Sequence, residues 1–67
     1  MIVLNGEGSD VAAGESVLDV LARLGFGRDA RGVAVAVDGE VVSRAQWESF
    51  TLAADATVEV LTAMQGG

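Results

Sequence analysis

The residues with the clearest chemical potential are the two glycines that end the sequence, Gly66 and Gly67. Glycine has no Cβ, so a pair of glycines can lie extended in a channel too narrow for other residues, and the Gly67 carboxylate is open to attack. Gln65 and the two glycines reach about 10 Å when extended, enough to bring that carboxylate into a partner's active site. A double glycine is weak evidence by itself, because frayed chain ends often have this composition.

The remaining side chains offer little independent chemistry, because the 67-residue sequence contains no cysteine, histidine or lysine. Without cysteine there is no thiolate nucleophile, disulfide or thiolate metal site. Without histidine the commonest general base and metal ligand is missing, and without lysine Schiff-base chemistry is excluded. We therefore expect a protein that is not an enzyme, with no metal site and no bound cofactor.

The charge balance is acidic, with a formal net charge of -6. This argues against a nucleic-acid partner, which would need basic patches. It favours a protein partner with a positive surface, or it serves solubility alone. No apolar run approaches the roughly 18–20 residues of a membrane span, and the first residues do not resemble a signal peptide, so we expect a cytoplasmic protein.

The first part of the sequence predicts a hairpin and a helix. Residues 1–4 form an apolar, β-branched run, residues 5–8 supply turn chemistry, and residues 9–12 can return as a second strand. Ser16 followed by Asp19 indicates a capped helix start, and Gly25 indicates its end. Its apolar face is predicted to comprise Val17, Leu18, Leu21 and Leu24.

The second part predicts three more strands. Residues 32–37 alternate with period two, Asp38-Gly39 is a strong hairpin turn, and residues 40–42 return. Residues 43–50 indicate a short helical turn whose aromatic residues, Trp47 and Phe50, are expected in the core. Residues 57–62 alternate again as the last strand.

This order of elements favours an α+β fold of the β-grasp type, ubiquitin-like, with a mixed sheet of four to five strands and one main helix on one face. We expect a β-grasp domain over residues 1–63 and a flexible C-terminal tail over residues 64–67, from Met64 to Gly67. In the last strand Val58 and Val60 should point inward. Glu59 and Leu61 then face outward, which makes Leu61 the expected apolar centre of a docking surface, flanked by Ala34 and Ala36.

The sequence resembles the thiamine-pathway sulfur carriers, a family of ubiquitin-like bacterial proteins, and the resemblance is strongest in three stretches. They are residues 33–42, the Arg44-Ala45-Gln46-Trp47 motif, and residues 58–67, which include the double glycine. The resemblance covers the whole chain. Ser43 stands where a proline commonly precedes the arginine, and Ala54-Asp55 stands where Gly-Asp is common.

The resemblance implies a function and a set of partners. A ubiquitin-activating-like enzyme would use ATP to adenylate the Gly67 carboxylate, and a persulfide on a sulfur donor protein would convert it to a thiocarboxylate. The thiocarboxylate would then deliver sulfur to thiazole synthase. Every catalytic residue would belong to a partner.

Other readings remain open. The small subunit of molybdopterin synthase, another Gly-Gly sulfur carrier and a protein modifier share the double-glycine ending. An acidic module that binds through its surface alone is a possibility from a different class. Removing Gly66 and Gly67 separates that module from the carriers, because a surface binder would keep its activity.

Overall fold

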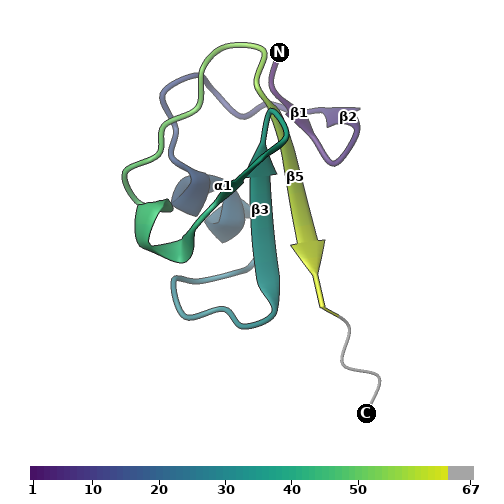
Figure 1. Cartoon of the computed structure of the whole chain (residues 1–67). Coiled ribbons are helices and arrows are strands. Elements are labelled where there is room, and N and C mark those ends of the chain that lie inside the picture. Colours follow the sequence, from purple (N-terminus) through teal and green to yellow (C-terminus); the bar gives the residue numbers. More distant parts are fainter. Residues whose placement is uncertain (64–67) are drawn as a thin grey trace.

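The computed structural model describes residues 1–63, which form a five-stranded sheet with a single α-helix against one face (Figure 1). The strand order is β2-β1-β5-β3-β4, with β1 and β5 parallel and the other neighbours antiparallel. The elements are β1 Val3–Leu4, β2 Glu7–Gly8, α1 Val17–Arg23, β3 Val33–Val37, β4 Glu40–Val42, the 3₁₀ turn η1 Arg44–Gln46, and β5 Thr57–Thr62. The predicted β-grasp fold is confirmed. None of the helices among these residues is long and apolar enough to cross a membrane.

The first hairpin is tighter than the sequence analysis expected. Asn5 (φ 51°) and Gly6 (φ 84°) are both left-handed, so they form a two-residue turn, and Leu4 pairs with Glu7. An Asn-Gly pair favours this turn type, because both residues tolerate positive φ. The second strand is therefore β2, and the prediction of a strand over residues 9–12 was wrong.

Helix α1 begins where the capping pattern predicts. The Ser16 hydroxyl accepts a hydrogen bond from the Asp19 N–H, and the Asp19 carboxylate accepts one from the Ser16 N–H, each at 3.0 Å. This reciprocal pair satisfies two backbone donors at the helix start. Val17 and Leu21 are buried as expected, whereas Leu24 is 40% exposed and Val20, which the predicted face omitted, is buried.

The core fills the space between α1, the sheet and the segment that crosses from β4 to β5. Trp47 is 2% exposed and anchors this crossing segment, as predicted, while Phe50 packs against the core from its edge. The buried apolar residues are Ile2, Val11, Val17, Val20, Leu21, Val35, Val37, Val42, Trp47, Leu52, Ala56, Val58 and Val60.

Asn5 also connects the first strand, β1, to the last strand, β5. Its side-chain oxygen accepts a 2.8 Å hydrogen bond from the Val60 N–H, two residues past Val58, the last residue of β5 that pairs with β1. The Asn5 N–H in turn donates to the Val58 carbonyl at 2.9 Å. The asparagine amide therefore continues the parallel pairing where the β1 backbone turns away.

We expect Asn5→Ala to lower the free energy of unfolding by about 2 kcal/mol, from a lost hydrogen bond and from alanine held at positive φ. Asn5→Asp keeps an acceptor at the same place and tolerates that φ, so its loss should be smaller. Urea denaturation followed by Trp47 fluorescence measures both. Equal stability of Asn5→Ala and the wild type would show that the side-chain bond to Val60 does not support the sheet.

Candidate functional site

Strand β5 presents its two sides to different environments. Val58 is fully buried and Val60 is 8% exposed, whereas Leu61 is 64% exposed on the face of the sheet away from α1. Glu59 is exposed on the same outer face. The predicted orientation of all four side chains is confirmed, because successive residues of a strand point to opposite faces.

The register between strands places the other predicted docking residues beside Leu61. Ala34 pairs with Leu61, and Ala36 pairs with Glu59. On its other side Ala36 pairs with Val41, which is 77% exposed. The outer face therefore carries an apolar patch across three strands, made of Ala34, Ala36, Val41 and Leu61, which we call the outer patch.

Val41 is the member of the outer patch that the sequence analysis did not select. The signal for it was present: if Asp38-Gly39 is a two-residue turn, Val37 pairs with Glu40, and the next pair is Ala36 with Val41. Because paired residues share a face of the sheet, the outward orientation of Ala36 determines that of Val41.

An open groove runs along one end of the outer patch, where β5 ends and β3 begins. Its volume is about 400 Å³, and its lining is mostly apolar. The lining residues are Gly32, Val33, Ala34, Leu61, Thr62 and Ala63. Small residues here leave room for a partner to approach the backbone closely.

Ala63 is the last residue that the structure describes, and its position is fixed by a backbone contact. Its N–H donates to the Gly32 carbonyl at 2.6 Å. Gly32 has φ 68°, and a Cβ added there would lie 3.4 Å from the Ala63 Cβ. We call this Gly32–Ala63 contact the tail root, because the predicted tail begins at the next residue. Met64, Gln65, Gly66 and Gly67 lie outside the described residues, so the predictions about them remain predictions.

The carboxylates with shifted pKa values lie in loops away from the outer patch. Hydrogen bonds from the Arg23 guanidinium, at 2.9 and 3.1 Å, and from the Ala12 N–H lower the pKa of Glu15. The N-terminal ammonium lowers the pKa of Asp55. Both shifts follow from surface ion pairs. No cluster of three or more potential metal ligands occurs within residues 1–63.

The fold and the site define a class of protein: a ubiquitin-like β-grasp domain whose middle strand leads within five residues to a double glycine. The ThiS family model matches residues 2–67, and the chain belongs to this family. It is a ThiS-like sulfur carrier of thiamine biosynthesis, in agreement with the sequence resemblance.

Two solved structures support this assignment. The crystal structure of the thiamine biosynthesis protein ThiS from Geobacter metallireducens has 31% sequence identity and a TM-score of 0.75, with 98% of this chain and 97% of that chain covered. An NMR solution structure of a thiamine biosynthesis protein from the same organism also has 31% identity, with a TM-score of 0.76 over 98% of this chain and 86% of that one. No curated protein matches the chain significantly.

Proposed function

We propose that the Gly67 carboxylate is the sulfur-carrying group and that a ubiquitin-activating-like enzyme adenylates it. A carboxylate oxygen attacks the α-phosphate of ATP bound to that enzyme, and pyrophosphate leaves. The product is a mixed anhydride between the Gly67 carboxyl group and AMP. Adenylation makes the carbonyl carbon electrophilic, which a free carboxylate is not.

Sulfur enters in the next two steps. The terminal sulfur of a persulfide on a donor protein attacks the activated carbonyl and displaces AMP, which gives an acyl disulfide. Two thiol groups of a reductant then reduce the acyl disulfide. The first attacks the donor sulfur, which releases the Gly67 thiocarboxylate and forms a mixed disulfide, and the second attacks that mixed disulfide, which releases the donor thiol and leaves the two reductant thiols joined as a disulfide. Thiazole synthase accepts the sulfur. The catalytic groups and the bound ATP belong to the partners, and the carrier itself holds no cofactor.

The observation that carries this proposal is the position of β5. It is the middle strand of the sheet, hydrogen-bonded on both sides, and the family match extends beyond it to residue 67. Four residues separate the tail root from the end of the sequence, a reach of about 14 Å. A firmly held strand thus provides the base from which the reactive carboxylate would enter a partner's active site.

The outer patch is the proposed docking surface for these partners. It is apolar, it is exposed, and its largest side chain, Leu61, lies two residues from the tail root. Glu59 adds a negative charge beside Ala36, and the net charge of -6 favours a partner whose surface around the docking site is positive. A partner that binds here would also lie close to the tail root, where the described part of the chain ends.

We expect Leu61→Asp to weaken the affinity for the adenylating enzyme about tenfold or more, because it places a charge at the apolar centre of the patch. Leu24→Asp is the matched control, since it makes the same change at an exposed leucine at the end of α1. Isothermal calorimetry measures the Kd values, and circular dichroism checks the fold. If the two variants bind equally well, the outer patch is not the docking surface.

We expect deletion of Gly67, addition of an alanine after Gly67, and Gly66→Val each to abolish ATP–pyrophosphate exchange with the adenylating enzyme. Deletion shortens the reach of the terminal carboxylate by about 3.5 Å, and the extension moves the carboxylate past the α-phosphate of ATP. Valine adds a branched side chain where the channel of the partner enzyme should admit none. All three variants should keep the circular dichroism of the wild type. Glu7→Gln, at the far edge of the sheet, is the control and should support exchange. Exchange by the truncated or extended forms at the wild-type rate would favour a module that acts through its surface alone.

A further inference from the structure

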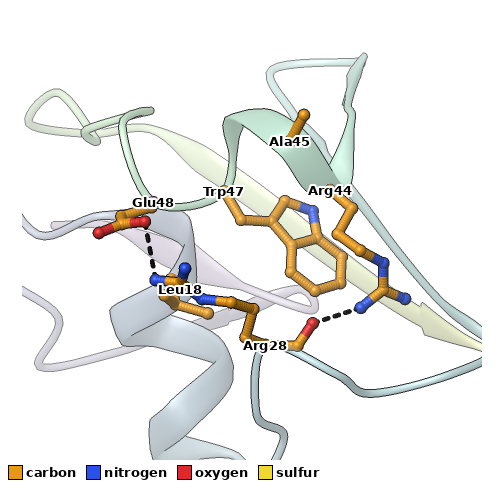
Figure 2. A pocket seen from close by; sticks show the side chains of 6 residues that line it. All are labelled: Leu18, Arg28, Arg44, Ala45, Trp47 and Glu48. Carbon is orange, nitrogen blue, oxygen red and sulfur yellow. Dashed lines mark hydrogen bonds and ion pairs between the residues drawn. The ribbon is translucent and has the colours of Figure 1, made fainter.

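The Arg44-Ala45-Gln46-Trp47 motif lies away from the outer patch, and neither docking nor the tail explains it. Trp47 is 2% exposed, and its indole N–H donates to the Val42 carbonyl at 3.2 Å, which fixes the ring against the end of β4. The Arg44 guanidinium carbon lies 4.5 Å from the centroid of this ring. Figure 2 shows the two groups side by side. The buried ring therefore provides a fixed surface on which the arginine head group rests.

From this position Arg44 binds the backbone of a distant loop. Its Nη1 donates to the carbonyl oxygen of Arg28 (Figure 2), and its Nη2 donates to that of Ala30. The two carbonyls belong to alternate residues of the loop between α1 and β3, residues 24–32. A guanidinium can hold both at once because its N–H donors have a fixed planar geometry, which a lysine ammonium lacks.

The loop has limited means of ordering itself. It contains three glycines, at positions 25, 27 and 32, and its backbone bonds to itself through the Ala30 N–H, which donates to the Gly27 carbonyl at 3.0 Å. The side chain of Arg28 pairs with Glu48 at 2.7 Å, but both side chains are well exposed, at 63% and 71%. Exposed ion pairs of this kind contribute little to the stability of the fold, so this pair restrains the loop only weakly. The first part of the loop is held by α1 and the core, since the Phe26 N–H donates to the Leu21 carbonyl at 2.8 Å and Phe26 packs against the core. The two bonds from Arg44 are therefore a principal restraint on the second part, residues 28–30.

The loop ends at the tail root. Gly32 follows Ala30 by two residues, a span of about 7 Å at most, and its carbonyl holds the Ala63 N–H. A displacement of the loop backbone at Ala30 would therefore also displace Gly32. Contacts run without a break from Trp47 through Arg44 and the loop to the last described residue of the chain.

We propose that Arg44 is a positioning residue for the reactive tail: by holding the loop at Arg28 and Ala30, it fixes Gly32 and so the direction in which the chain leaves β5 at Ala63. This role rests on the proposed function of Gly67. Within residues 1–63 the side chain of Arg44 contacts the loop backbone and the Trp47 ring. It acts through the tail root, so its loss should affect the rate of adenylation more than the docking of the folded body.

The test compares Arg44→Gln with Arg31→Gln. Both remove one positive charge, and Arg31 is an exposed arginine in the same loop with no ion pair or side-chain hydrogen bond recorded to any residue in 1–63. The first measurement is hydrogen exchange of the Ala63 amide in the free carrier. Exchange should be faster in Arg44→Gln and unchanged in Arg31→Gln, while the amides of β3 and the first part of β5 keep their protection in both.

The second measurement is ATP–pyrophosphate exchange with the adenylating enzyme. We expect kcat to fall about tenfold in Arg44→Gln with KM within about twofold of the wild type, because misplacement of a reacting group acts on the chemical step. Arg31→Gln should match the wild type. Arg44→Lys keeps the positive charge over Trp47 but lacks the planar set of N–H donors, so its kcat should lie between that of Arg44→Gln and that of the wild type.

The two measurements separate this inference from the function on which it rests. If wild-type carrier fails to support pyrophosphate exchange, the proposed function is wrong. If the wild type supports it and Ala63 exchanges equally fast in all variants, Arg44 does not hold the tail root. Faster exchange at Ala63 with an unchanged kcat would also overturn the positioning role, because the contact would then be structural only. A kcat of Arg44→Lys equal to that of the wild type would contradict the role of the planar guanidinium, because a positive charge alone would then be sufficient for full activity.

Discussion

The whole structure depends on the two-sided pairing of β5. Thr57 and Ala63 bond toward β3, through the Asp38 N–H and the Gly32 carbonyl, whereas Val58 and Val60 bond toward β1. Because β5 is the middle strand, it joins the β1–β2 pair to the β3–β4 pair in one sheet. The side chains of β5 alternate between the two faces of the sheet: Val58 and Val60 lie in the core, and Leu61 is exposed on the outer face. One strand thereby completes the core, carries part of the proposed docking surface and ends at the tail root.

The small size of the domain explains why single polar contacts matter. A chain of this length buries only about 60% of its unfolded surface, so its core leaves little stability in reserve. The β1 strand is two residues long, and the Asn5 side chain extends its pairing with β5. The loop before β3 is rich in glycine, and the Arg44 side chain holds it. In both places a side chain supplies hydrogen bonds that a longer strand or a stiffer loop would have provided through the backbone.

Local patterns in the sequence predicted most of the fold. Period-two alternation predicted β5 with the observed bounds, and the Ser16–Asp19 capping box predicted the start of α1. The failures have physical causes. The second strand was misplaced because the Asn5-Gly6 turn returns the chain at once. The outward orientation of Val41 was missed because it depends on the pairing of Val41 with Ala36 of β3 and not on a local pattern in β4. The Arg44 contacts were missed because they join residues that are 14 and 16 positions apart in the sequence. The family resemblance supplied the sulfur-carrier function, which no pattern of periodicity contains.

The proposed function requires that the Gly67 carboxylate become a thiocarboxylate, while the folded body only presents it to the partners. The most direct test is the intact mass of the carrier after incubation with ATP, the adenylating enzyme, a persulfide donor and a thiol reductant. We predict a mass increase equal to the replacement of one oxygen by sulfur, located by fragmentation at Gly67 and absent when ATP is omitted. An unchanged mass under conditions that activate a known carrier, or a sulfur adduct elsewhere in the chain, would contradict it.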